Sequence, residues 1–223
     1  MSCVTAVRPP SATLRGRFVQ LQPLGSAALP ELHAAIAHRA VFANGYGGGL
    51  SALKTDVDGF VVWARNYFQW ESLPYAVRLL GGLNDGDLVG TTTLGDLNLE
   101  HESAQLGWTA YDPRVWGTAV NAETKLLLLG EAFRNGFGRI QIQADSINAR
   151  SRAAIEGIGA TFEGVLRRDR PRADGTWRDT AVYSILADEW PSVRAGLRAR
   201  VDAYPGRSIT YRRVPRANDD VRR

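Results

Sequence analysis

The segment Gly107–Lys125 (GWTAYDPRVWGTAVNAETK) predicts a strand that leads directly into a helix. Alternating residues predict the strand, Asp112-Pro113 ends it, and apolar periodicity predicts a helix from Thr118. The first turn of a helix presents N–H groups without intrahelical partners and a partial positive charge. Small residues there leave the backbone open to a ligand. Arg114–Asn121 therefore predicts an anion site suited to a diphosphate, although many purely structural turns show a similar pattern.

Periodicity and turn signals divide the rest of the chain in the order β-α-α-β-β-β-α-β-α-β-β-α, without an internal repeat. The chain thus predicts one mixed α/β domain at residues 13–204, a flexible leader at 1–12 and a basic, disordered tail at 205–223. Strands are expected at Leu14–Leu21, Leu73–Leu80, Asp87–Leu97, Ala104–Tyr111, Arg139–Ala144, Phe162–Arg168 and Trp177–Leu186. Helices are expected at Ala27–His38, Thr118–Asn135 and Asn148–Ile158. Two more helices are expected, one that begins at a cap formed by Thr55 and Asp58 and one that is capped by Asp188.

Composition indicates an ordinary globular protein. Hydrophobic residues make up 44% of the 223 residues and charged residues 22%. No apolar run approaches the roughly 18 residues that a membrane span needs, and no secretion signal is recognised, so no membrane partner is expected. Cys3 is the only cysteine, which excludes an internal disulfide and favours a cytoplasmic location.

The positive charge is concentrated in the predicted tail. Pro205–Arg223 holds six arginines and two aspartates, a balance of +4 that equals the net charge of the chain, so residues 1–204 are neutral. Nucleic-acid binding is therefore expected only weakly, through the tail, which is otherwise a solvated end. Three histidines and one cysteine give no metal-ligand spacing, so no metal is expected. Asn44–Gly49 (NGYGGG) lacks the remainder of a phosphate-loop motif and is expected to be a flexible connector.

Several motifs together resemble a known family. Arg114-x-x-Gly117-x-Ala119 resembles the (Q/R)-x-x-G-x-(G/A) signature of acetyl-CoA-binding loops in the GNAT superfamily of N-acetyltransferases. The surroundings are similar to the RimJ/RimL branch, and the match runs in order over about residues 14–203. Its other motifs are Gln105-Leu106-Gly107-Trp108, Asn121-Ala122-Glu123-Thr124-Lys125, Asn148-Ala149-Arg150-Ser151, Gly159-Ala160 and Glu163-Gly164-Val165-Leu166-Arg167.

The resemblance implies a GNAT fold, in which helices flank one mixed, mostly antiparallel sheet and two splayed strands form the acetyl-CoA cleft. It implies acetyl-CoA as the bound cofactor and CoA as the product. The strand backbone would hold the pantetheine arm, and the loop would hold the pyrophosphate. The residues implied are Trp108, Thr109, Ala110 and Tyr111 on the strand, and Arg114, Val115, Trp116, Gly117, Thr118, Ala119 and Val120 on the loop.

The same resemblance implies two catalytic side chains. Asn148 would hydrogen-bond the cofactor arm near the thioester, and Ser151 would be the general acid for the departing thiolate. Both residue types also favour helix starts, so capping is the competing interpretation for each.

The general base is not evident. The family's usual glutamates correspond here to Gln105 and to about Arg170, neither of which can take the proton. Nearby alternatives are more typical of solvated loops and strand edges: Asp96, Glu100, His101, Glu102 and Asp179. A site without a strong base favours a low-pKa acceptor such as a peptide α-amine.

The leading interpretation is an N-acetyltransferase that transfers the acetyl group of acetyl-CoA to a primary amine by direct attack. The amine would be a protein N-terminus or a small molecule. Alternatives are a non-catalytic CoA-binding regulatory module, a transferase for a larger acyl-CoA such as succinyl-CoA, and a ribosome- or RNA-associated factor that uses the tail. A homodimer is left open.

Overall fold

A computed structural model describes residues 6–213 of the chain. Its eight strands form one sheet in the order β1-β2-β3-β4-β5-β6-β8-β7. Every neighbouring pair is antiparallel except β5 and β6, which confirms the predicted mixed, mostly antiparallel sheet. The strands are β1 (Leu14–Arg15), β2 (Val19–Pro23), β3 (Leu73–Leu79), β4 (Leu88–Asn98), β5 (Ser103–Tyr111), β6 (Arg139–Asp145), β7 (Thr161–Pro171) and β8 (Trp177–Leu186).

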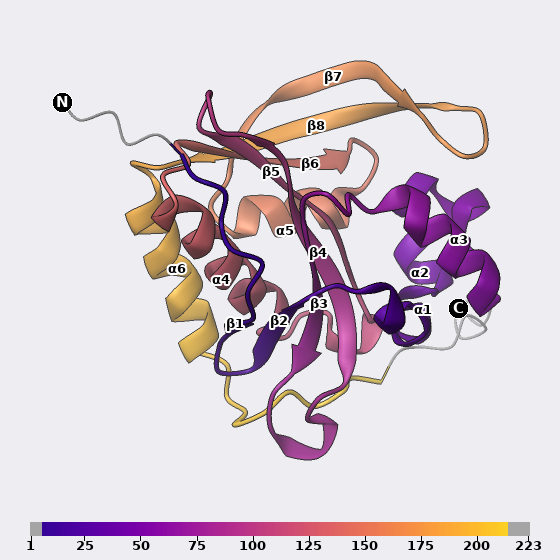
Figure 1. The fold of residues 1–223 in the computed structure, drawn as a ribbon, viewed down its shortest axis with the longest axis horizontal. Helices are drawn as coiled ribbons and strands as arrows, with labels where there is room; N and C mark the ends of the chain where they lie inside the picture. Colours follow the sequence, from indigo (N-terminus) through magenta and orange to yellow (C-terminus); the bar gives the residue numbers. More distant parts are fainter. Residues whose placement is uncertain (1–5, 214–223) are drawn as a thin grey trace, which may run out of the picture.

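Helices cover both faces of the sheet, as Figure 1 shows. One apolar cluster joins the sheet to α4 (Val120–Arg134), α5 (Ala149–Gly157) and α6 (Trp190–Asp202). A second cluster joins the opposite face to α1 (Leu29–Ile36), α2 (Arg39–Phe42) and α3 (Val57–Tyr67). Two cores on either side of one sheet account for the single mixed domain. Within the described part of the chain, no helix has the length and apolarity to cross a bilayer.

The sheet opens between β5 and β6. These strands pair only where Ser103–Gln105 lies opposite Arg139–Gln141, although both continue further. A bulge accompanies the opening, because two β5 residues, Trp108 and Thr109, lie opposite Thr92 alone on β4. The backbone of Trp108 has a φ of 51°, and bulges bend a strand away from its neighbour. This opening, called the seam below, is the splayed strand pair that the resemblance implies.

The first predicted strand is a hairpin instead. Leu14–Leu21 contains β1, a turn and the start of β2. The turn is fixed by Glu123 on α4, whose carboxylate accepts hydrogen bonds from the amides of Arg17, Phe18 and Val19 at 2.7, 2.6 and 2.8 Å. That acceptor lies more than a hundred residues away in the sequence, so the local alternation missed the turn.

The predicted caps of α3 (Thr55 with Asp58) and of α6 (Asp188) are wrong, because the residues at these helix starts are Asp56 and Glu189. Asp56 caps α3, because its side chain accepts a hydrogen bond from the amide of Gly59. The residue before α6 is Glu189, not Asp188, and its carboxylate binds the amide of Leu186 instead of capping the helix. The expected connector Asn44–Gly49 forms tight turns, in which four glycines have positive φ.

Both predicted flexible ends pack against the domain where the structure describes them. In the leader, Ala6 is buried and the amide of Val7 donates to the carbonyl of Asn135 at 2.9 Å. In the predicted tail, Ile209 is only 2% exposed within the core. Burial of these apolar side chains explains the difference. Residues 1–5 and 214–223, the remainder of these predicted ends, lie outside the described residues.

Candidate active site

The connection from β5 to α4 is shaped by a buried aspartate. Asp112 accepts hydrogen bonds from the amide of Arg114 at 2.8 Å and from its guanidinium at 2.6 to 3.1 Å. Pro113–Val115 then forms a single 3-10 turn. Gly117 follows with a φ of 71°, a left-handed conformation that favours glycine. The Asp-Pro stop and the glycine thus place the start of α4 beside the end of β5.

Four backbone amides at this helix start have no hydrogen-bond acceptor within residues 6–213. They belong to Gly117, Ala119, Asn121 and Ala122. Within the same residues, Ala119 at the N-cap of α4 makes no side-chain cap, and only the amide of Val120 finds a side-chain acceptor, Thr118 Oγ1 at 3.3 Å. Free donors at the positive end of a helix dipole fit a phosphate group. The predicted loop residues therefore surround an unsatisfied set of donors.

The predicted strand residues line the seam. Beyond Gln105, β5 runs on to Tyr111 without pairing to β6 on that side. Trp108–Tyr111 therefore present a backbone edge at the open part of the seam. The hydroxyl of Tyr46, from the other face of the sheet, lies 3.4 Å from the carbonyl oxygen of Trp108.

The segment between β6 and α5 lies against the loop between β5 and α4. Asn148 caps α5, since its Oδ1 accepts a hydrogen bond from the amide of Ser151 at 2.9 Å. The capping interpretation is therefore correct for the oxygen of Asn148. The hydroxyl of Ser151 has no hydrogen-bond partner within the described residues. Between them, Arg150 stacks on the ring of Trp116 at 3.6 Å, which brings the start of α5 against the loop.

Comparison with known proteins decides the family. Residues 19–161 match the family model described as an acetyltransferase (GNAT) domain. A structure described as an acetyltransferase from T. thermophilus is 31% identical, with 87% of this chain and 100% of that chain covered and a TM-score of 0.77. The chain belongs to the GNAT acetyltransferase family.

Two further structures agree in fold. A GCN5-related N-acetyltransferase from Brucella melitensis is 24% identical, with 87% of each chain covered and a TM-score of 0.77. Mycobacterium smegmatis RimJ in complex with CoA-disulfide is 22% identical, with 86% of this chain and 97% of that chain covered and a TM-score of 0.68. A search of the curated proteins found no match. The resemblance to the RimJ/RimL branch is confirmed, and GNAT homologues bind acetyl-CoA or CoA.

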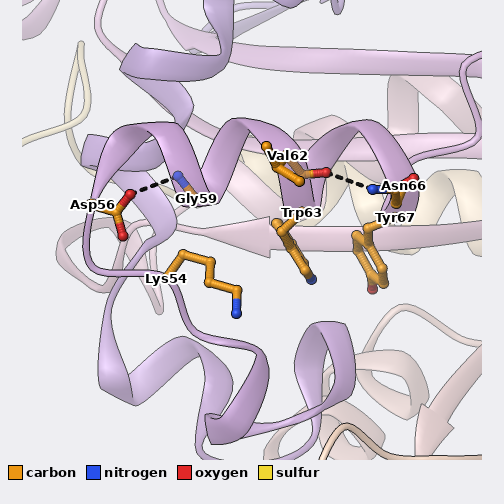
Figure 2. A pocket seen from close by; sticks show the side chains of 7 residues that line it. All are labelled: Lys54, Asp56, Gly59, Val62, Trp63, Asn66 and Tyr67. Atoms are coloured by element: carbon orange, nitrogen blue, oxygen red, sulfur yellow. Dashed lines mark hydrogen bonds between the residues drawn. The ribbon is translucent and has the colours of Figure 1, made fainter.

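The acetyltransferase has an aromatic wall beside the seam. Tyr46 packs against Trp63 and Tyr67 of α3, with ring centroids 6.3 and 5.6 Å away. Burial raises the pKa of Tyr67 to about 12. Figure 2 shows Trp63 and Tyr67 on the side of α3 that faces Lys54. These three residues are among those that line a hollow of about 710 Å³. The resemblance implied that Gly45–Trp70 flanks the acceptor cleft, but the expected connector at Asn44–Gly49 did not predict the packing of Tyr46 against α3.

Two arginines face each other beyond this wall. Arg170 of β7 lies opposite Arg178 of β8 in the sheet register. Arg170 binds Asp169 and the side chain of Gln143 on β6, whereas the buried Nε of Arg178 has no partner in the described part of the chain. Burial and the charge of Arg170 lower the pKa of Arg178.

The base candidates named from the sequence lie in the β4–β5 turn or have hydrogen-bond partners elsewhere in the fold. The turn after β4 carries Glu100, His101 and Glu102, and it joins the paired end of β5. Asp96 accepts a hydrogen bond from Gln69, and Asp179 accepts one from the amide of Arg168. Among the described residues, no group of three or more His, Cys, Asp or Glu side chains is placed to hold a metal.

Lys125 is a buried cation that the sequence did not reveal. The sequence left open whether Glu123 and Lys125 orient the loop or form a surface charge pattern; the structure excludes the surface pattern, because they are only 3% and 5% exposed. The Nζ of Lys125 donates to the hydroxyls of Thr109 and Thr92 at 2.8 and 3.3 Å. Burial lowers its pKa from 10.5 to about 7. Lys125 therefore links α4 to Thr109 in the β5 bulge and to Thr92 opposite it on β4.

Replacing Lys125 with methionine should stabilise the protein at pH 7 by about 2 kcal/mol. The lowered pKa corresponds to a penalty on the order of 4 kcal/mol, which the lost hydrogen bonds partly offset. Because the folded pKa lies below the unfolded one, the unfolded chain binds more protons between pH 7 and 10.5, and wild-type stability rises over that range. Urea unfolding of both proteins at several pH values measures this, and a difference that stays constant from pH 7 to 10 would contradict it.

Proposed function

We propose that this acetyltransferase transfers the acetyl group of acetyl-CoA to a primary amine by direct nucleophilic attack. The observation that carries the proposal is the set of free amides at Gly117, Ala119, Asn121 and Ala122, next to an open strand edge. A diphosphate and an extended amide-bearing arm need these two elements side by side. Membership of an enzyme family favours turnover over a non-catalytic CoA-binding role.

Each element has a distinct part in binding. The loop and first helical turn hold the diphosphate through backbone amides, within Arg114–Val120 and the turn that follows. The backbone of Trp108–Tyr111 orients the pantetheine arm as an added strand. Bound acetyl-CoA supplies an acetyl thioester. The Lys125–Thr109 hydrogen bond fixes the bulge, so the strand edge is preorganised for this orientation.

Ser151 is the proposed proton donor to the departing thiolate. Its hydroxyl is free of other partners in the described residues, and its backbone is fixed by the Asn148 cap. Asn148 keeps its side-chain amide nitrogen for the cofactor arm while its oxygen caps the helix. Cys3 lies outside the described residues, so the structure does not place it.

We expect the enzyme to prefer α-amines to lysine side chains by at least about tenfold in kcat/KM at pH 7. Deprotonation of a lysine amine costs about 4.6 kcal/mol at that pH, whereas an α-amine near 7.8 costs about 1 kcal/mol. The measurement compares one peptide with a free N-terminus and an acetylated lysine against its counterpart with the two groups exchanged. Equal values for the two peptides would contradict this preference.

Turnover assays test the proposal as a whole. The purified chain is mixed with acetyl-CoA or succinyl-CoA and with peptide and small-molecule amines, and the acylated amine is identified by mass spectrometry. Direct transfer predicts an acetylated product and no labelled protein after incubation with radiolabelled acetyl-CoA alone. A stable acyl-enzyme would refute direct transfer, and a product only with succinyl-CoA would replace the acetyl donor with the larger one.

A further inference from the structure

The C-terminal segment Pro205–Arg213 is built into the domain beside the loop. After α6 it passes the turn between β3 and β4, where its yellow trace is seen in Figure 1. Ile209 is buried in the core, and its carbonyl accepts a hydrogen bond from the side chain of Asn84 at 3.3 Å. These contacts anchor the segment just before it reaches α4.

Tyr211 then fixes the segment to the loop. Its hydroxyl donates to the carboxylate of Asp87 at 2.6 Å. The guanidinium of Arg114 lies over its ring, 4.0 Å from the centroid. Cation–π packing and a charge-assisted hydrogen bond hold the next residue in place.

Arg212 lies directly over the glycine of the loop. Its amide donates to the carbonyl of Arg114 at 2.8 Å, and its Nη1 donates to the carbonyl of Trp116 at 3.0 Å. A Cβ built on Gly117 would be 2.5 Å from that Nη1. The guanidinium therefore covers Gly117, next to the free amides at the start of α4.

The charge of Arg212 is not balanced within the described residues. Arg114, its neighbour, is paired with buried Asp112, whereas Arg212 forms no salt bridge there. A guanidinium has five donors, and only one of those of Arg212 has an acceptor in the same residues. Arginine with free donors beside unsatisfied backbone amides is the arrangement that phosphate recognition requires.

We propose that Arg212 is a phosphate-binding residue of the CoA site, supplied by the C-terminal segment. The inference rests on the proposed function, because the ligand is the CoA that the loop would hold. The group contacted is a CoA phosphate ester, either the diphosphate or the 3′-phosphate. The segment thus belongs to the donor site, and truncation after Tyr204 should impair CoA binding.

Calorimetry with CoA and kinetics with two donors test this proposal. Arg212→Ala should weaken CoA binding by about tenfold or more, since a hydrogen bond between charged groups is lost. Arg212→Lys keeps the charge and should therefore lose less affinity for CoA than Arg212→Ala. Arg213→Ala is the matched control, because Arg213 is exposed and its side chain forms no hydrogen bond with any other residue among 6–213. It should stay within about twofold of wild type.

Donors that differ only in their phosphates separate binding from a structural role. With acetyl-pantetheine, which carries no phosphate ester, kcat/KM should be the same for wild type and Arg212→Ala. Arg212→Ala should have a lower kcat/KM than the wild type with acetyl-CoA. If this difference disappears with acetyl-dephospho-CoA, the 3′-phosphate is the group that Arg212 contacts. If the difference persists, the diphosphate is the group contacted. Both results support the proposal.

Three results would overturn it. An equal loss with acetyl-pantetheine would show that Arg212 only shapes the loop. Tighter CoA binding by Arg212→Ala would show that the segment obstructs the site. Unchanged CoA affinity would remove Arg212 from the site. Absence of CoA binding by the wild-type protein would instead contradict the proposed function. Thermal unfolding without ligand is the control that shows whether each variant is folded.

Discussion

Gly117→Glu should weaken CoA binding by at least about 100-fold, or roughly 2.7 kcal/mol. The substitution places a carboxylate among the amides that would receive the diphosphate, and like charges a few ångströms apart repel by several kcal/mol near a protein surface. The new carboxylate also attracts the guanidinium of Arg212, which lies over this position. In addition, a side chain at a φ of 71° is strained. Calorimetric titration with CoA gives the change in affinity.

Two further variants separate charge from backbone strain. Gly117→Gln has similar bulk without the charge and should lose clearly less affinity. Gly175→Glu is the matched control, since Gly175 has a φ of 84° in the turn between β7 and β8 and open space where a Cβ would lie. It should bind CoA like the wild type. If Gly117→Glu keeps wild-type affinity, the loop is not the phosphate site.

Glu123→Ala should destabilise the protein by about 3–5 kcal/mol. The carboxylate is buried and is the acceptor for three consecutive backbone amides of the β1–β2 turn. Its removal leaves those amides without an acceptor in an apolar surrounding, and each such group is expensive to bury. Urea unfolding measures the free energy, and a loss below about 1 kcal/mol would show that water replaces the carboxylate.

A double-mutant cycle with Gly16 tests the geometry itself. A Cβ on Gly16 would lie 2.5 Å from the carboxyl carbon of Glu123, so Gly16→Ala should destabilise the wild-type protein. In the Glu123→Ala background the same change should have little effect, because the clash is gone. Additive effects in this cycle would contradict the close approach of the hairpin to α4.

Local sequence signals predicted most of the sheet and the loop. Asp112-Pro113 ends β5 and Gly117 precedes α4, because an aspartate acceptor and a left-handed glycine act within a few residues. The existence of the strands followed from alternation for the same reason.

Features made by distant residues were not predictable. The β1–β2 turn depends on Glu123, the wall at the seam on Tyr46, and the cover of the loop on Arg212. A run of arginines is also typical of a solvated end, and only the neighbouring Ile209 and Tyr211 determine that this one is packed. The general base has no local signature, and two of the carboxylates considered for it, Asp96 and Asp179, accept hydrogen bonds from Gln69 and from the amide of Arg168.

The seam also bears on self-association. Unpaired strand edges normally invite pairing with another protein chain. Here the free edges of β5 and β6 converge where Ser103–Gln105 meets Arg139–Gln141, so the gap is a wedge closed at one end. A whole foreign strand cannot run through such a wedge in register, whereas a slender, unbranched chain can enter from the open end. The fold thereby keeps backbone donors and acceptors available in the middle of a sheet without offering a template for aggregation.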